Sequence, residues 1–493
     1  MYAMPIRAVP KSNGNFRLVA DQSLGQYSLN SMVEPHEEAF PLDNMTQLGE
    51  AILKAREKQG SRTALTLFKC DVAEAYRILP MHPCWQIKQI YTIDGERYVD
   101  RNNSFGGTRS GDLFISFMSL VVWIARTLKG VDNLLAYCDD TFGVAAAADK
   151  LYYDKYKKKF PRPQTLLLQL WDELGIPHKL EKQQFGNPLT IIGIAVECGK
   201  KKDTMSLPKD VRQGLLDELQ RFIDSKADNQ FTLREFRNMA GWLSWALNIF
   251  PLLRPALNNV YPEMAGRTNK NKTMPVSEAV RSDLRWAAGH LKESSGVRVM
   301  NCQGDENGAE SVTAEWTPTD PNHIVYCDST TNNIAFWIPK RSTGFVAPIP
   351  DGYSSKIIFF WEILCVTLAM DHILKKASKK RLLVYCDNKD IVLILNTLKC
   401  RPEYNGLLRQ ISDRLMAGDH DLRVVLSKPE ENSKKIADAL AKGDLTSTLR
   451  LQSNITITSF QIPKELLGAA AGLSMSTFKG LWENLRAYIP SLS

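Results

Sequence analysis

The sequence predicts an α+β protein of several domains. Its 493 residues correspond to roughly three domains at about 150 residues each. A composition of 44% hydrophobic and 24% charged residues is typical of a globular chain and excludes wholesale disorder. Strand-like runs alternate with helical stretches over residues 1–204, helices follow, and a second alternation begins near residue 321. These three observations together predict the fold class.

Charge and cysteine content narrow the functional classes. Lys and Arg number 62 and Asp and Glu 54, so the formal charge is +8, which permits a nucleic-acid partner without requiring one. The nine cysteines form no CxxC pair and no zinc-ligand spacing, so we expect a reduced intracellular protein of the cytoplasm or nucleus. The apolar run 113–125 is shorter than the about 20 residues of a membrane span, so no membrane partner is expected.

Apolar runs and caps predict the elements of the first 257 residues. Buried strands are predicted at residues 65–70 (LTLFKC), 134–138 (LLAYC) and 189–196 (LTIIGIAV). Between the first two strands, residues 112–129 are mostly apolar and predict a helix. Residues 207–257 have a helical pattern, within which Thr232 and Glu235 have the spacing of a capping box.

The second half repeats an α/β pattern after a polar linker. Residues 301–320 are polar and punctuated by Gly and Pro. Beyond them, strands are predicted at 324–327 and 382–386, with helices at 361–374 and after Lys389. The last 45 or so residues have only a weak pattern, and residues 446–493 are left unassigned.

Three acidic residues follow two of the strands in the first half. Asp71 follows the run LTLFKC, and Asp139 and Asp140 lie between two apolar runs, as at the turn of a hairpin. If these strand ends are neighbours, three carboxylates meet and repel one another unless cations lie among them. Hard oxygen ligands suit Mg²⁺, and two such ions about 4 Å apart stabilise the attacking and leaving oxygens of a phosphoryl transfer. The alternative is that these acids mark solvated turns.

Five ordered segments resemble the motifs of reverse transcriptases. They are PKSNGNFRLVADQSLGQYSLN, LFKCDVAEAYRILPMHP, SFGGTRSGDLF, AYCDDTFGV and HKLEKQQFGNPLTIIGIAVE. The resemblance implies a right-hand polymerase with fingers and palm at 1–204, a helical thumb at 205–265 and a connection or linker at 266–320. It also implies that Asp71, Asp139 and Asp140 are catalytic metal ligands for Mg²⁺, with Mn²⁺ as an alternative ion.

The same resemblance assigns residues to substrate contacts. They are Lys11, Arg17, Tyr76, Phe105, Gly106 and Lys182. It implies that Arg17 and Lys11 meet the triphosphate, that Tyr76 screens the sugar 2′-OH, and that Lys182 donates a proton to pyrophosphate. Each has a structural alternative: a surface charge for Arg17, core packing for Tyr76 and a plain turn at residues 105–106.

Four further acids lie at regular points of the second α/β pattern. Asp328 and Asp387 end predicted strands, Glu362 lies in a helix, and Asp438 is expected to open a late helix. Such a set suits paired Mg²⁺ ions that activate water for hydrolysis. The order and placement resemble ribonuclease H over residues 321–445, which implies that all four acids are catalytic metal ligands.

Two features depart from the usual ribonuclease H pattern. Residues 330–333 (TTNN) stand where the family has a Gly-rich turn, and no His lies between Asp421 and Asp438. The missing His puts its product-release or water-handling role in doubt, but not the metal site. The residues that resemble the four family acids are all present.

Cysteine and lysine patterns accompany these acids. A cysteine precedes an acid four times, at Cys70, Cys138, Cys327 and Cys386. Because neighbours on a strand point to opposite faces, we expect these cysteines to face the core if the acids face a cleft. Basic residues gather at 155–159 and at 375–381; the second run is either a helix C-terminus or a grip on the phosphates of an RNA–DNA hybrid.

The sequence therefore predicts a reverse transcriptase with ribonuclease H activity. Its expected partners are an RNA template, a DNA primer, the RNA–DNA hybrid and dNTPs, with other element-encoded proteins as further candidates. VYCDN and the ending ENSKKIADALAKGD resemble DIRS-like (tyrosine-recombinase) retrotransposons most, and Gypsy-like elements second. The alternatives are an inactive or domesticated nucleic-acid-binding scaffold and a fragment of an element product.

Overall fold

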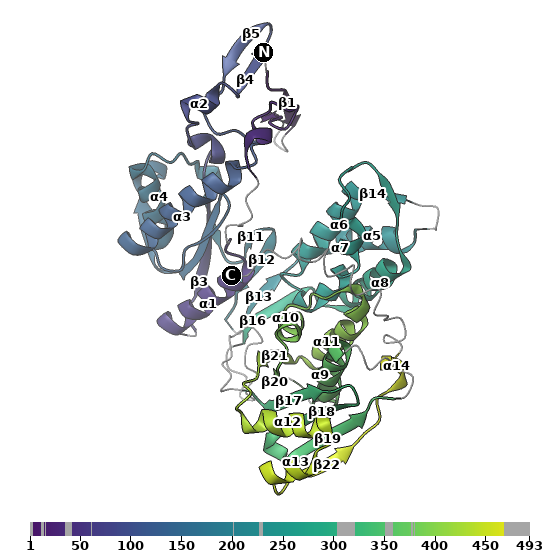
Figure 1. The fold of residues 1–493 in the computed structure, drawn as a ribbon. Coiled ribbons are helices and arrows are strands. Elements are labelled where there is room, and N and C mark those ends of the chain that lie inside the picture. Colours follow the sequence, from purple (N-terminus) through teal and green to yellow (C-terminus); the bar gives the residue numbers. More distant parts are fainter. Residues whose placement is uncertain are drawn as a thin grey trace. The chain divides into compact units, whose positions relative to one another are not determined.

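The computed structural model divides into two compact units. It describes residues 3–10, 14, 16–34, 42–60, 62–200, 202–225, 230–302, 321–350, 358–375, 378 and 380–467. One unit extends to Met205 and takes in residues 300–302; the other comprises Ser206–Val299 and the described residues beyond 320. Both mix helices with strands (Figure 1), so the predicted α+β multidomain class is confirmed. The finer domain boundaries stay predictions.

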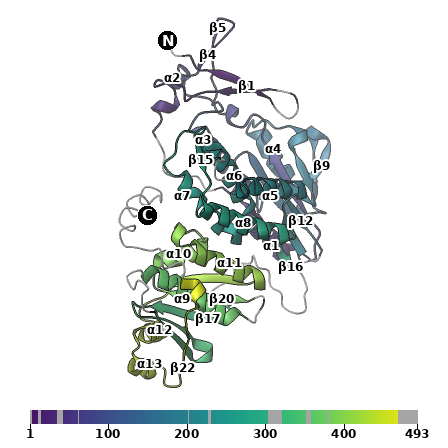
Figure 2. The same ribbon diagram turned by 90° about the vertical axis from the view of Figure 1, so that its right-hand side faces the viewer.

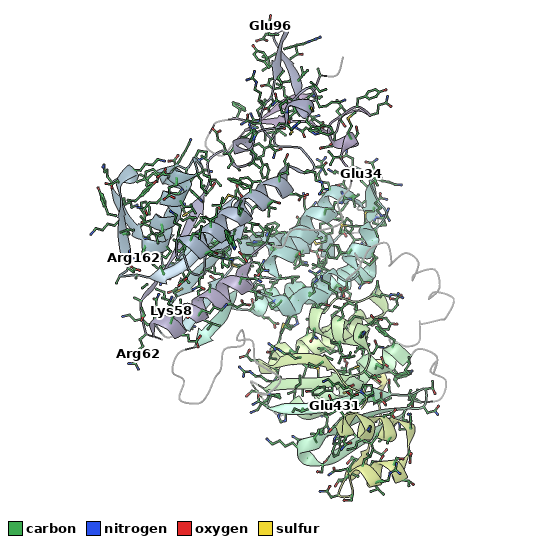
Figure 3. The ribbon with its side chains drawn as sticks, turned by 60° about the vertical axis from the view of Figure 1, so that its left-hand side comes forward. Glu34, Lys58, Arg62, Glu96, Arg162 and Glu431 are labelled. Atoms are coloured by element: carbon green, nitrogen blue, oxygen red, sulfur yellow. The ribbon has the colours of Figure 1, made fainter. Side chains whose placement is uncertain are left out.

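A four-stranded antiparallel sheet is the centre of the first unit. Its order is β10-β3-β7-β6, with bounds Gln184–Gly186, Leu65–Asp71, Asp140–Ala146 and Leu135–Tyr137. The apolar run of β3 is buried because helices α3 (Ser110–Leu128) and α4 (Arg162–Glu173) pack on it around Phe68, Phe114 and Trp171. Helix α1 (Met45–Gln59) contacts β7; Figure 3 labels Lys58 near its end and Arg162 at the start of α4.

Helix α3 has two different apolar sides. Its length and mean hydropathy of 1.5 match a membrane span, the one such helix among the residues searched, although only 28% of its 18-residue window is buried. One side, with Phe114 and Met118, belongs to the core beside β3. The other side exposes Leu113, Leu120 and Trp123. The predicted helix at 112–129 is thus present, and one of its sides packs in the core.

The rest of the first unit consists of hairpins and a second small sheet. The hairpins are β1–β2 (Ile6–Pro10, Phe16–Ala20), β4–β5 (Ile90–Ile93, Glu96–Val99) and β8–β9 (Lys150–Tyr153, Lys158–Pro161), with the short helix α2 at Pro83–Gln86. The sheet has the order β11-β12-β13-β16, at Leu189–Ile191, Ile194–Cys198, Lys202–Ser206 and Val297–Cys302; of its last strand, only residues 300–302 are counted with this unit. The single strand predicted at 189–196 is wrong, because Ile192 (φ +49°) and Gly193 (φ +77°) turn the chain back on itself.

Helices dominate the start of the second unit. They are α5 (Lys209–Ile223), α6 (Leu233–Ala246), α7 (Val260–Met264) and α8 (Glu278–Glu293), with a small sheet of β14 (Gln230–Thr232) and β15 (Thr273–Pro275). The predicted capping box is present: Thr232 accepts from the Glu235 amide, and the Glu235 carboxylate accepts from the Thr232 amide. The rings of Phe222 and Phe231 stack on each other beside Phe236, so these side chains pack α5, β14 and α6 together.

A six-stranded sheet completes the second unit (Figures 1 and 2). Its order is β21-β20-β17-β18-β19-β22, with bounds Asp421–Leu426, Arg381–Cys386, His323–Ser329, Asn333–Ile338, Thr343–Pro348 and Thr456–Ser459. Strand β17 is parallel to β20 and antiparallel to β18. The helices are α9 (Ile358–Leu374), α10 (Lys389–Thr397), α11 (Asn405–Gly418), α12 (Asn432–Lys442), α13 (Leu445–Leu451) and α14 (Lys464–Leu467). The strands predicted at 324–327 and 382–386 and the two predicted helices are therefore present.

Successive side chains of β18 point to opposite faces of this sheet, and a helix packs on each face. Phe336 and its alternate neighbours pack with α9, whereas Ala335 and Trp337 pack against α12. Because α9 is enclosed by the sheet, α10 and α11, it is apolar on nearly all sides, unlike the amphipathic α12. Of the four acids of this unit, α9 carries Glu362 and α12 carries Asp438.

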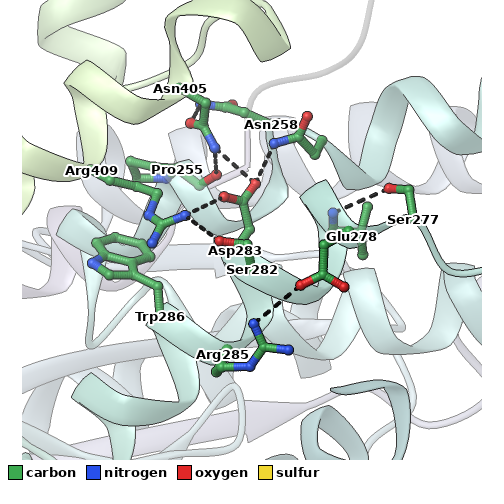
Figure 4. Close-up of polar contacts among 12 residues, drawn as sticks. Pro255, Asn258, Ser277, Glu278, Ser282, Asp283, Arg285, Trp286, Asn405 and Arg409 are labelled. Atoms are coloured by element: carbon green, nitrogen blue, oxygen red, sulfur yellow. Dashed lines mark hydrogen bonds and ion pairs between the residues drawn. The ribbon is translucent and has the colours of Figure 1, made fainter. Parts of the chain in front are cut away.

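A buried polar network joins the helical part of the second unit to its six-stranded part (Figure 4). Asp283 on α8 is 2% exposed and accepts from Asn259 Nδ2 (2.6 Å), Asn405 Nδ2 (2.8 Å) and Arg409 Nη1 (3.1 Å). Burial raises the pKa of Asp283, and these donors oppose that effect. The network links α8 with α11.

Removing this carboxylate should destabilise the protein strongly. We expect Asp283→Ala to lower the free energy of unfolding by about 2–4 kcal/mol, because the buried amide of Asn405 and the partly buried donors of Asn259 and Arg409 lose their acceptor. Arg285→Ala is the matched control on the same helix, since its pair with Glu278 is exposed and is worth less than about 1 kcal/mol. Urea unfolding of both variants measures the difference; equal losses would contradict a special role of Asp283.

Candidate functional site

A tight hairpin places the acids of the first unit beside one another. Strands β3 and β7 pair with Asp71 opposite Asp140, and Tyr137 pairs with the same Asp140 across the turn of β6 and β7. The two-residue turn is Cys138–Asp139, with Cys138 in the left-handed region at φ +53°. The structure thus has the predicted hairpin, with Asp139 at its tip.

The charges at this hairpin act on one another. Burial raises the pKa of Asp71; Lys182 opposes this and the Asp139 charge adds to it. Burial also raises the pKa of Asp140, which Lys69 opposes and Asp139 again increases. Lys182 donates through Nζ to Asp71 Oδ1 at 2.8 Å and to the Val72 carbonyl at 3.2 Å. In this structure the expected proton donor is therefore an ion-pair partner of the first acid.

Aromatic packing positions Tyr76 near these acids. It lies in the turn η2 (Ala75–Ile78), and its ring centroid is 5.2 Å from that of Phe105 and 5.3 Å from that of Phe114. Burial raises the pKa of its hydroxyl, and the charge of Asp139 adds to this effect. Tyr76 is therefore half-buried but held next to the acidic turn, which is compatible with both the packing and the substrate-contacting alternatives.

Gly106 makes a close backbone approach that no other residue can make. Its φ of +114° is strained for any L side chain, and an added Cβ would lie 2.2 Å from the carbonyl oxygen of Ala20. Its own carbonyl accepts a hydrogen bond from Asn30 Nδ2 at 2.8 Å. The segment after Phe105 is thus tied to the loop that follows β2.

The two residues expected at the triphosphate cannot be placed as a pair. Lys11 lies outside the described residues. Arg17 lies on β2, where its backbone pairs with Val9 of β1, while its side chain lies outside the described part. Their assignment stays a prediction.

Two parallel strands of the second unit place Asp328 and Asp387 side by side. Strands β17 and β20 pair in parallel with Tyr326 next to Tyr385, and the rings of these tyrosines stack at 4.5 Å. Two residues farther along, Asp328 lies at the end of β17 and Asp387 directly after β20. Burial raises the pKa of Asp328, and the charges of Asp387 and Asp438 raise it further against Lys434.

Lys434 joins these two acids and was not among the residues predicted from the sequence. Its Nζ lies 2.9 Å from Asp328 Oδ1 and 3.0 Å from Asp387 Oδ2, and its side chain is 9% exposed. One signal was available: Lys434 and Asp438 are four residues apart, so they share a face of α12. This signal is weak, because a lysine four residues from an acid is common on the exposed face of a helix.

Glu362 and Asp438 complete this group from two helices. Asn388 Nδ2 donates to Glu362 Oε2 at 2.7 Å. Burial raises the pKa of Glu362 to about 7, with contributions from the charges of Asp387 and Asp328. Asp438 does not open its helix as expected, because α12 already begins at Asn432; it pairs with Lys442 at 2.8 Å.

Neither group of acids forms a ready-made ion site here. Within the described ranges, no set of three or more His, Cys, Asp or Glu side chains is close enough together to hold a metal, so the predicted convergence is only partial. Instead an ammonium lies against the acids in each unit, Lys182 on Asp71 and Lys434 between Asp328 and Asp387. The donors nevertheless fit Mg²⁺, since they are hard carboxylate oxygens whose burial demands a cation.

Three of the four cysteines face the core as predicted. Cys70, Cys327 and Cys386 are at most 2% exposed, and burial raises the pKa of Cys70 and Cys386 to about 12, which keeps these thiols protonated. The prediction is wrong for Cys138, which is half-buried because it lies in the hairpin turn and not in a strand.

The basic runs are only partly described. Lys376 and Lys379 lie outside the described residues. Lys380 donates its backbone amide to His420 Nδ1 at 3.1 Å, and Lys155 pairs with Asp172. Phosphate contacts of either run stay predictions.

Comparison by sequence finds no matching family model and no matching curated protein. Among solved structures, the chain is similar to a foamy viral protease-reverse transcriptase, described in complex with double-stranded DNA and with an RNA/DNA hybrid. In its dRH form the TM-score is 0.44 at 13% identity, covering 87% of this chain and 66% of that chain. The protease-reverse transcriptase in complex with dsDNA has a TM-score of 0.43 at 13% identity, covering 87% of this chain and 78% of that chain. The complex with the RNA/DNA hybrid has a TM-score of 0.39 at 13% identity, covering 90% of this chain and 73% of that chain.

Proposed function

We propose that this chain is a reverse transcriptase, a right-hand polymerase that extends a DNA primer on RNA or DNA templates. The observation that carries the proposal is the hairpin of β6 and β7, which presents Asp139 and Asp140 beside Asp71 on β3. These three carboxylates would hold Mg²⁺, which, when bound, stabilises the attacking and leaving oxygens of phosphoryl transfer. The five ordered sequence motifs support the same function.

The chain's own residues in this proposal bind and orient the substrate. Tyr76, held by Phe105 and Phe114, excludes a sugar 2′-OH by its bulk. Gly106 lets the backbone pass close to the end of β2, which fixes the nucleotide-contacting segment. Lys182 leaves Asp71 and donates its proton to the pyrophosphate. Positioning of this kind supplies much of the rate in a reaction between two bound substrates.

A ribonuclease H activity of the second unit is the second part of the proposal. Asp328 and Asp387 on neighbouring parallel strands, with Glu362 and Asp438 on flanking helices, support it. They would hold Mg²⁺, which, when bound, activates water for cleavage of the RNA strand of a hybrid. We further propose that the chain comes from a DIRS-like element, with Gypsy-like elements as the second choice. Its proposed location is intracellular.

Two assays with the purified full chain test these activities. Primer extension on RNA and DNA templates with dNTPs and Mg²⁺ should give elongated products, and EDTA should abolish them. Cleavage of an end-labelled RNA–DNA hybrid should show the nuclease in the same preparation. A protein that binds the hybrid tightly but neither extends a primer nor cleaves RNA would overturn the proposal in favour of a nucleic-acid-binding scaffold or an element fragment.

Sugar selection provides a residue-level prediction. Tyr76→Ala should lower discrimination against ribonucleotides by about 10–100-fold, because the bulk that would clash with the 2′-OH is removed. Tyr76→Phe is the matched control and should keep wild-type selectivity, since it retains the ring that packs on Phe105 and Phe114. Single-nucleotide incorporation kinetics with dNTP and rNTP measure the ratio. An unchanged ratio for Tyr76→Ala would leave Tyr76 with a packing role alone.

A further inference from the structure

Lys434 is a buried cation between two candidate metal ligands. Its ammonium lies within 3.0 Å of carboxylate oxygens of both Asp328 and Asp387, and only 9% of its side chain is exposed. The two acids come from different strands and Lys434 from a third element, α12. The contact is therefore a tertiary link that holds three separate segments at the carboxyl ends of β17 and β20.

The helix itself does not favour a cation at this position. Lys434 lies in the first turn of α12, three residues after the N-cap residue Glu431, which Figure 3 labels. The helix dipole makes the N-terminal turn unfavourable for positive charge, and burial of an ammonium is costly unless it is paired. The neighbouring Lys435 in the same turn is exposed, as expected. The attraction of Asp328 and Asp387 must therefore hold Lys434 in the interior.

We propose that Lys434 is a tethered counter-ion of the nuclease centre, which holds Asp328 and Asp387 together and is displaced from them when divalent cations bind. This inference rests on the proposed nuclease function. Mg²⁺ ligated by the same carboxylates at 2.0–2.1 Å would lie within a few ångströms of the ammonium, and the two charges repel. Lys434 consequently weakens Mg²⁺ binding while it stabilises the centre in the absence of Mg²⁺.

The test measures Mg²⁺ binding and not cleavage. In full-length protein, Lys434→Met should lower the half-saturating Mg²⁺ concentration by about tenfold or more, because the competing charge is removed. It should also lower the melting temperature in EDTA and enlarge the rise that Mg²⁺ produces. Calorimetric titration with MgCl₂ and melting curves give both quantities. An Asp387→Asn variant supplies the Mg²⁺ response of the rest of the chain, which is subtracted.

Two further variants separate charge from fold. Lys435→Met removes the same charge from the same helical turn without touching the acids, so it should behave like the wild type. Lys434→Arg retains the charge and should keep weak Mg²⁺ binding and the wild-type stability in EDTA. If Lys434→Met binds Mg²⁺ no more tightly than Lys435→Met, the counter-ion role is overturned while the nuclease proposal stands. If the wild type shows no Mg²⁺ response above Asp387→Asn, the nuclease centre and this inference both fail.

Discussion

Replacing Asp139 by asparagine is expected to lower the rate of dNTP incorporation by at least about 10²–10³-fold. Asp139 lies at the tip of the β6–β7 hairpin and interacts with both Asp71 and Asp140, whose pKa values its charge raises. The variant removes one ligand charge from the polymerase centre with little change of shape. Steady-state and single-turnover primer extension measure the loss.

The same variant should leave hybrid cleavage at the wild-type rate, because the proposed nuclease residues belong to the other compact unit. Asp132→Asn is the matched control, since Asp132 is 63% exposed and pairs only with Lys58 at the surface among its described contacts. It should extend primers normally. Extension by Asp139→Asn at the wild-type rate would refute the polymerase assignment of this hairpin.

Replacing Glu362 by glutamine is expected to lower RNA cleavage by at least about 10²–10³-fold and to weaken the rise in melting temperature that Mg²⁺ produces. The variant keeps the size of the side chain but loses one of the four candidate ligand charges. Primer extension should continue. Asp371→Asn is the control on the same helix, because Asp371 pairs with Arg414 away from this group. Continued cleavage by Glu362→Gln would show that the four acids are not a metal site.

The difference in stability between Glu362→Gln and the wild type should depend on pH in a defined direction. The pKa of Glu362 is about 7 in the folded protein and near 4.5 when unperturbed. In EDTA the contribution of Glu362 to the stability of the wild type therefore falls as pH rises from 4.5 to 7, because the unfolded chain releases the Glu362 proton first. Glutamine lacks the effect, so above pH 7 the variant should be more stable than the wild type by about 1–3 kcal/mol, and below pH 4.5 by almost nothing. Chemical unfolding at pH 4.5 and 8 measures it; an unchanged difference would contradict the burial of this charge.

Local patterns predicted much of the fold because their causes are local. The apolar run before Asp71, the apolar helix at α3 and the capping box of Thr232 and Glu235 each depend on neighbours within a few residues. The placement of Asp328 and Asp387 at strand ends likewise follows from apolar runs that end in an acid. Their adjacency followed only once β17 and β20 paired in parallel.

Three errors show where local patterns failed. The run 189–196 does not reveal the turn at Ile192 and Gly193 by its hydrophobicity, because two short buried strands joined by a tight turn have the same apolar signal as one long strand; Gly193 alone marks the break. The apolar run 134–138 predicts Cys138 in a strand, but Cys138 has a left-handed backbone in a two-residue turn. Asp438 was expected at a helix start, but α12 begins six residues earlier, without a side-chain cap at Glu431.

The sequence by itself determined the α+β class, most element positions and the acids at strand ends, because periodicity and capping are short-range effects. Only the tertiary structure decided which charges neutralise those acids. Lys182 is 111 residues from Asp71 along the chain, and Lys434 is 106 residues from Asp328. An ion pair between such distant residues depends on strand pairing, burial and the low dielectric of the interior, which no local pattern records. A buried ammonium beside two carboxylates is therefore a property of the folded chain alone.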